Sequence, residues 1–260
     1  MKVKFSVSQY ILPAFVLLVY FILYAPIIVL VLFSFNKGSL PYQWHGFSLT
    51  WYYELFKSVE ILAALKNSLI VAFSSVLLSV SMGLLYVFYG ASNFLNKLVV
   101  FFYGSLIVPE IVFAVGLLSF FSFFSVPLGI TTLIVGHTLI GFGYVVPLIR
   151  SRFLEIDYSL VEASMDLGAS DTQTFFKIII PILYPAIVSS ALLVFIISLD
   201  DFLISFFCSG AETMTLPMYI FSEIRSGATP VVNALSTLLL LISSFLIFIL
   251  TSLKTRTRVF

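Results

Sequence analysis

The sequence predicts an all-α membrane protein with six transmembrane helices and a short helical element between the fourth and fifth spans. Of its 260 residues, 61% are hydrophobic and only 10% are charged, and the mean hydropathy is +1.16. A soluble domain usually has about 25% charged residues, so the apolar excess here must face lipid. Six segments also reach the length of about 20 apolar residues that a bilayer-spanning helix requires.

The six predicted spans form one transmembrane domain over residues 1–260. They cover roughly 10–35, 61–90, 96–125, 130–150, 178–209 and 231–253. The first apolar run follows Lys2 and Lys4, as in a signal peptide, but it is too long and lacks a small-residue cleavage site. We therefore predict that it is retained as a span.

The distribution of Lys and Arg predicts the orientation. Six spans place both termini on one side, and that side carries Lys2, Lys4, Lys97, Arg150, Arg152, Lys177, Lys254, Arg256 and Arg258. The other side carries Lys37, Lys57, Lys66 and Arg225. Because cytoplasmic loops are richer in these residues, both termini are expected in the cytoplasm, as in a multi-pass protein of a bacterial inner membrane.

The composition also excludes several functions. There is no basic run for nucleic acid, and one cysteine, Cys208, permits no internal disulfide or multi-cysteine metal site. No Gly-x-x-x-x-Gly-Lys-[Ser/Thr] loop is present, so the chain cannot hydrolyse ATP alone. We predict no enzyme site and no cofactor on this chain, and we interpret His137 in the fourth span as a packed residue.

The polar interruption between the fourth and fifth spans predicts a helix–glycine–helix element over about 158–176. Asp157 or Ser159 can cap its start, and Gly168 can end its first helix. Ser170 and Gln173 have the spacing of a capping box for the second helix. On the predicted cytoplasmic side, this shape fits either docking to another protein or an ordinary connecting loop.

The first helix of this element is predicted to have two faces. Glu162 and Asp166 lie one turn apart, where two carboxylates repel slightly and a cationic partner would stabilise them. The opposite face is formed by Leu160, Ala163, Ser164 and Leu167.

Glu162, Ala163, Ser164 and Gly168, followed by Ile-Ile-Ile-Pro at 178–181, resemble the EAA signature of ABC-importer permeases. That signature has Glu-Ala-Ala, a glycine, nine residues and then Ile-x-Leu-Pro, so Ser164 replaces its second alanine. The resemblance implies a coupling helix that fits a cleft on an ATPase subunit. It assigns ATPase contact to Glu162 and bending to Gly168, and less directly a role to Ser164; Ala163 and Asp166 belong to the same coupling segment.

Three acids lie inside the predicted spans, and the only Lys or Arg in the same spans is Lys97, at the start of the third. Glu110 follows Pro109 near the middle of the third span, and Asp200 and Asp201 lie far along the fifth span, near its outer mouth. Ionisable residues in spans are functional candidates by default. The alternatives are a protonated Glu110 bonded to a carbonyl freed by Pro109, and simple interfacial exposure of the two aspartates.

The segments 107–113, 198–202 and 230–235, together with 43–47 around Trp44, resemble the second permease subunit of spermidine/putrescine importers. The resemblance covers most of the chain from about 30 to 245. It implies a polyamine path through Trp44, Glu110, Asp200 and Asp201. Trp44 could hold an ammonium group by cation–π contact or could anchor the chain at the interface.

The implied assembly has a second permease, two ATPase subunits that bind ATP and Mg, and an extracytoplasmic polyamine-binding protein. A proton-coupled secondary transporter of a small organic cation, with Glu110 as its proton site, is the alternative. A membrane enzyme acting on lipid would need a catalytic constellation that the sequence lacks.

Overall fold

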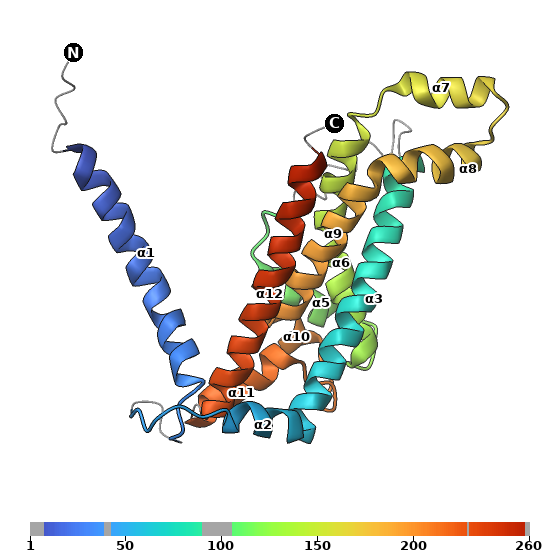
Figure 1. Ribbon diagram of the computed structural model, residues 1–260. Helices are drawn as coiled ribbons and strands as arrows, with labels where there is room; N and C mark the ends of the chain where they lie inside the picture. Colours follow the sequence, from blue (N-terminus) through green and yellow to red (C-terminus); the bar gives the residue numbers. More distant parts are fainter. Residues whose placement is uncertain (1–7, 39–42, 90–105, 228, 258–260) are drawn as a thin grey trace, which may run out of the picture. The chain divides into compact units, whose positions relative to one another are not determined.

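The computed structural model describes residues 8–38, 43–89, 106–227 and 229–257 (Figure 1). Within these ranges the chain forms helices and loops, with one isolated antiparallel bridge between Asn36 and Phe47. The chain divides into two compact units. Met1–Ser58 and Ser222–Leu241 form the first unit, and Val59–Phe221 and Ile242–Phe260 form the second.

Five helices of the described part are long and apolar enough to cross a membrane. They are α1 (Ser8–Phe33), α3 (Val59–Tyr89), α6 (Ile130–Phe153), the run that ends in α9 (Ile180–Asp200), and α12 (Pro230–Thr257). Each matches one of the six predicted spans to within a few residues at most ends. The all-α membrane fold is therefore confirmed.

The third predicted span is represented by a shorter helix, α5 (Glu110–Phe123). Pro109 precedes it, and the Pro109 carbonyl accepts hydrogen bonds from the amides of Val112 and Phe113. Residues 96–105 of this predicted span, including Lys97, lie outside the described residues. A total of six spans thus stays a prediction.

The fifth span differs from the predicted range 178–209 at both ends. Its helix begins with α8 (Asp171–Thr174), passes through a π-helical turn (Phe175–Ile179) and continues as α9. The chain then leaves the helix after Asp200, and a separate helix, α10, covers Leu203–Cys208. A periodic apolar sequence does not reveal this break because α9 and α10 are both apolar.

The core of the second unit lies between α3, α6 and α9. A cluster of buried aliphatic and aromatic side chains fills it, including Val80, Val145, Ile149 and Leu183. Gly141 of α6 allows close approach, because a Cβ there would lie only 2.8 Å from Cγ1 of Val194. Small residues at such contacts are typical of helices that pack inside a membrane.

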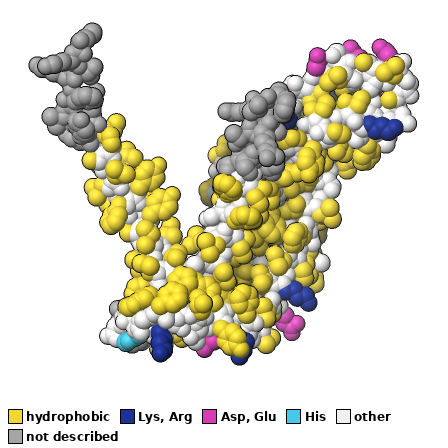
Figure 2. Space-filling view, in the orientation of Figure 1, with side chains coloured by type: hydrophobic (Ala, Val, Ile, Leu, Met, Phe, Trp, Pro, Cys, Tyr) yellow, Lys and Arg dark blue, Asp and Glu magenta, His cyan; other side chains and the backbone are white. Residues whose placement is uncertain are grey.

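The first unit contains α1, α2 (Thr50–Lys57) and the chain between them, and α11 (Leu216–Gly227) and α12 each contribute to both units. The apolar stretch of α1 has no buried residue in its most hydrophobic window, and Figure 2 shows hydrophobic side chains along it. A helix that is apolar on all sides belongs in lipid or against another apolar surface.

Candidate functional site

The element between α6 and α9 begins with α7 (Tyr158–Asp166), which Asp157 caps. Oδ1 of Asp157 accepts a hydrogen bond of 3.0 Å from the Ser159 amide. This bond stabilises the ionised carboxylate and lowers the pKa of Asp157 below its ordinary value. Of the two caps that the sequence permitted, the structure contains the one at Asp157.

The turn between α7 and α8 is built from backbone hydrogen bonds around Gly168. The Gly168 amide donates to the Met165 carbonyl at 2.8 Å, and the Ala169 amide donates to the Ser164 carbonyl at 3.0 Å. Gly168 has φ = +84°, a conformation that side chains with a Cβ rarely adopt. The predicted glycine end of α7 is therefore present, as a left-handed turn.

Ser170 and Gln173 form the predicted capping box of α8. The Gln173 amide donates to the Ser170 hydroxyl, and the Gln173 side-chain carbonyl accepts from the Ser170 amide. The two short helices thus each have their own cap, with the turn at Gly168 between them.

The face of α7 that carries Leu160, Ala163, Ser164 and Leu167 is buried at one position only. Ser164 is that buried residue, and its hydroxyl contacts that of Thr174 at 2.8 Å. Leu160 and Leu167 are 48% and 89% exposed, and Ala163 is exposed as well. Ser164 and Val161 supply the contact of α7 with the rest of the unit.

The outer surface of α7 therefore carries both apolar and acidic side chains. Glu162 and Asp166 are exposed, beside the exposed Leu160, Ala163 and Leu167. Figure 2 shows acidic side chains gathered over α7. Such a mixed surface suits a partner that offers an apolar groove with cationic groups at its rim.

Glu110 is the first residue of α5 and its side chain is exposed to a cavity of about 240 Å³. The rest of the lining is mainly apolar, with Tyr144 of α6 as a polar member and Ile197 of α9 opposite. A carboxyl group that opens on a small cavity among apolar helices can receive a cation or a water molecule.

Asp201 lies at the break between α9 and α10 and is only 6% exposed. Its two carboxyl oxygens accept hydrogen bonds from the amides of Ile204, at 3.4 Å, and Ser205, at 2.9 Å. Its carboxyl group also lies close to that of Glu110. Asp200, by contrast, is exposed, so the two neighbouring acids have different surroundings.

His137 of α6 is buried, as predicted for a packed residue, and it joins this group of acids. Its Nδ1 lies 2.8 Å from the Ser198 hydroxyl, and its Nε2 lies 3.2 Å from the Ser205 hydroxyl and 3.4 Å from Oδ2 of Asp201. These partners could not be predicted from the sequence, because they lie 61 and 68 residues further along the chain, in other helices.

Trp44 belongs to the first unit, and the three acids belong to the second. Its ring is 52% exposed and its edge packs against Phe33. Asn36 holds the neighbouring chain, because its side chain donates to the Gln43 carbonyl at 2.6 Å and accepts from the His45 amide at 2.8 Å. Trp44 therefore lies beside hydrogen-bonded backbone, and its side chain is about half exposed.

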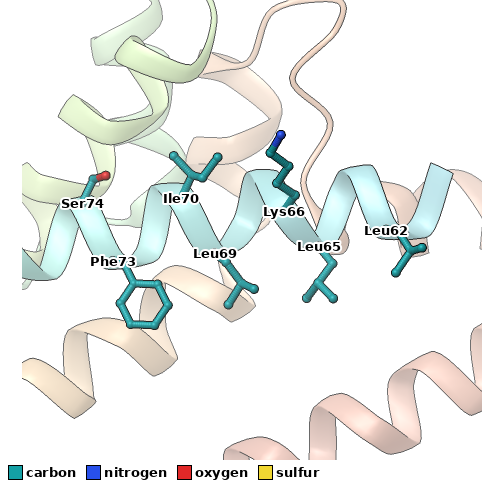
Figure 3. A pocket seen from close by; sticks show the side chains of 7 residues that line it. All are labelled: Leu62, Leu65, Lys66, Leu69, Ile70, Phe73 and Ser74. Atoms are coloured by element: carbon teal, nitrogen blue, oxygen red, sulfur yellow. The ribbon is translucent and has the colours of Figure 1, made fainter. Parts of the chain in front are cut away.

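A second hollow, of about 530 Å³, runs along α3 (Figure 3). Its lining is apolar except for Lys66 and Ser74, and it contains no carboxylate. It therefore offers nothing for a cationic substrate, in contrast to the cavity at Glu110.

Sequence comparison identifies close relatives among transport proteins. The chain is 39% identical to the spermidine/putrescine transport system permease protein PotC of Haemophilus influenzae, over 94% of this chain and 95% of that one. It is 36% identical to the putrescine transport system permease protein PotI of Escherichia coli K12, over 84% and 81% of the two chains. No protein-family model matches the chain.

Solved structures of the same fold are ABC transporters. A chain of the bacterial alginate ABC transporter, solved with an alginate-bound periplasmic protein, has a TM-score of 0.70 at 17% identity and 96% coverage of both chains. A chain of the MetNI methionine ABC transporter has a TM-score of 0.57 at 20% identity, covering 79% of this chain and 99% of that one. Together with the sequence identities, which extend over most of each chain, this agreement shows that the chain belongs to the family of spermidine/putrescine ABC-importer permeases.

Proposed function

We propose that this chain is a membrane-spanning subunit that carries spermidine or putrescine into the cytoplasm. It would pair with a second permease, two ATPase subunits that hold ATP and Mg, and an extracytoplasmic polyamine-binding protein. The observation that carries the proposal is 39% identity to a spermidine/putrescine permease over 94% of the chain. Both termini would lie in the cytoplasm, with the protein in the bacterial inner membrane.

The bent element around Gly168 would be the contact with an ATPase subunit. Its support is the EAA-like sequence together with the exposed side chains of Glu162, Ala163 and Asp166 on one short helix. Ser164 would act differently from these residues, because it is buried and bonded to Thr174. It would fix α7 on α8, so that a push on the outer surface moves both helices together.

The substrate path would use Trp44, Glu110, Asp200 and Asp201. Glu110 and Asp200 are exposed and could each receive an ammonium group, while the Trp44 ring could bind one by cation–π contact. Asp201 is already engaged with backbone amides, so its part would be to shape the site beside Glu110. Polyamines carry several positive charges, which matches acids without Lys or Arg partners among the described residues of these helices.

Uptake by the reconstituted complex tests this function. The chain would be co-expressed with its partner subunits, placed in proteoliposomes loaded with ATP, and supplied with binding protein and labelled spermidine or putrescine. We expect ATP-dependent uptake, its loss in Glu162→Lys, and a raised KM in Glu110→Gln. Glu212→Lys is the matched control, because Glu212 is an exposed acid outside both proposed sites.

The same assay addresses the proton-coupled alternative, which the kinship to ABC permeases does not favour. That mechanism predicts uptake without ATPase subunits and its collapse when the proton gradient is removed. Uptake of this kind, or normal uptake by Glu162→Lys, would contradict the importer.

A further inference from the structure

A buried polar cluster joins α6 to the break between α9 and α10. It consists of His137, Ser198, Asp201 and Ser205, and each of these is no more than 6% exposed. The cluster lies beside Glu110, whose carboxyl group is close to that of Asp201. It therefore connects the interior of the helix bundle with an acid that opens on a cavity.

The chemistry of the cluster assigns the imidazole proton. Oδ2 of Asp201 already accepts from the Ser205 amide at 2.9 Å, so it faces Nε2 of His137, at 3.4 Å, as an acceptor, and the imidazole proton lies on Nε2. Nδ1 then accepts from the Ser198 hydroxyl at 2.8 Å. In this arrangement a neutral imidazole links α6 to both sides of the break.

The position of Asp201 depends on this link. The backbone turns at Asp201 between two helices, and the local contacts of the carboxyl group are the amides of Ile204 and Ser205 on the next turn. These contacts fix Asp201 to α10, which Thr132 of α6 also holds through the Cys208 carbonyl at 2.7 Å. Among the described residues, His137 is the α6 side chain that contacts the Asp201 carboxyl group itself, at 3.4 Å, so it acts directly on where that group lies.

We infer that His137 is a positioning residue for transport: it holds the Asp201 carboxyl group beside Glu110, and so shapes the acidic part of the substrate path without touching the substrate. The inference rests on the proposed function. It goes beyond that function because it gives a role to a residue outside the acids and aromatics of the path.

Two amide substitutions of His137 distinguish the contact made by Nε2 from the contact made by Nδ1. A glutamine amide reaches about as far as Nε2 and can keep the bond toward Asp201, whereas an asparagine amide reaches about as far as Nδ1 and keeps the Ser198 contact alone. In the reconstituted complex we expect His137→Gln to retain most of the wild-type uptake efficiency. His137→Asn should lose about tenfold, the order expected when a bond to a buried charged group is lost.

Thr138→Val is the matched control on the same helix. The Thr138 hydroxyl is buried and has no hydrogen-bond partner in the described part of the chain, so its removal should leave uptake unchanged. Equal losses in Thr138→Val and His137→Asn would mean that α6 tolerates no change here, and would overturn the specific role of His137.

A double-mutant cycle distinguishes positioning from general stability. If His137 acts through Asp201, then His137→Asn should cause little further loss of uptake when Asp201→Asn is already present. An undiminished tenfold loss in that background overturns the inference, as does wild-type uptake by His137→Asn. If no His137 variant assembles, Ser205→Ala takes its place in the cycle with the same two outcomes.

Failure of this inference and failure of the proposed function look different. A wild-type complex that hydrolyses ATP but moves no polyamine contradicts the proposed function. Wild-type uptake that is indifferent to His137→Asn contradicts the inference alone.

Discussion

Helices end at two breaks in this chain, and the polar groups at the two breaks find their hydrogen-bond partners in different ways. At Gly168 the caps come from neighbouring residues, and the acids of α7 point outward. At Asp201 the acid points inward, and its side-chain partner outside the next turn is His137, which lies in another helix. One break carries an exposed surface, and the other encloses a polar cluster.

The two breaks differ because the bend at Gly168 is exposed to water, whereas the break at Asp201 is buried. Water can satisfy polar groups at an exposed bend, so short-range caps are sufficient there. Inside a membrane protein a buried polar group without a partner is costly, and the partner has to come from the protein itself. A break at Asp201 can therefore exist only where tertiary structure brings His137, Ser198 and Ser205 to it.

The largest effect on stability is expected from Asp201→Ala. This change leaves the amides of Ile204 and Ser205 and the Nε2 of His137 without their acceptor, at a cost of about 2–3 kcal/mol. Thermal unfolding of the purified protein in detergent would measure the cost. Asp200→Ala, at an exposed position, should change it by about 0.5 kcal/mol or less. Equal losses at both positions would show that the buried break is no more demanding than an exposed site.

Gly168→Ala should have the next largest effect. A Cβ at φ = +84° costs about 1–2 kcal/mol, although no heavy atom would obstruct it. Hydrogen exchange of the amides of Gly168 and Ala169 should become faster, since these amides close the turn. Gly116→Ala in the interior of α5, also with open space around it, should instead leave exchange in α5 unchanged or slower. Unchanged exchange at the turn in Gly168→Ala would argue against a conformational need for glycine.

Ser164→Ala, which restores the alanine of the EAA signature, should cost about 1 kcal/mol. It leaves the buried Thr174 hydroxyl without its partner, since the two oxygens lie 2.8 Å apart. Adding Thr174→Val should recover most of the loss, because both polar groups are then gone. Thermal unfolding of the two single variants and the double variant gives the coupling energy, and strict additivity would contradict a direct bond.

The smallest effect is the pH dependence of the α7 cap. The pKa of Asp157 is lowered in the folded protein, so the cap contributes fully above its ordinary pKa and is lost as the pH falls below about 4. Protection of the Ser159 amide, measured against its intrinsic exchange rate at each pH, should fall as the pH drops below about 4. Asp157→Asn, which caps without titrating, should abolish this loss of protection. The same loss in the asparagine variant would show that the carboxylate is not its cause.

The local sequence was sufficient to predict the caps at the exposed bend, but not which residue of α7 is buried. The spacing of Asp157, Gly168, Ser170 and Gln173 predicted the caps, because capping depends on residues a few positions apart. The same sequence placed Leu160, Ser164 and Leu167 on one face of α7, but only the structure shows that Ser164 is buried and that the two leucines are exposed. Periodicity identifies a face, but it cannot say which face has a neighbour.

The sequence by itself determined the membrane class, five of the spans and the acids that lack basic partners, because these depend on composition and on apolar lengths along the chain. Only the tertiary structure decided that Asp200 is exposed while Asp201 is buried, and that His137 meets the break at Asp201. The physical reason is that a buried polar group is satisfied by whatever the fold brings to it, and those partners come from helices that are distant in sequence.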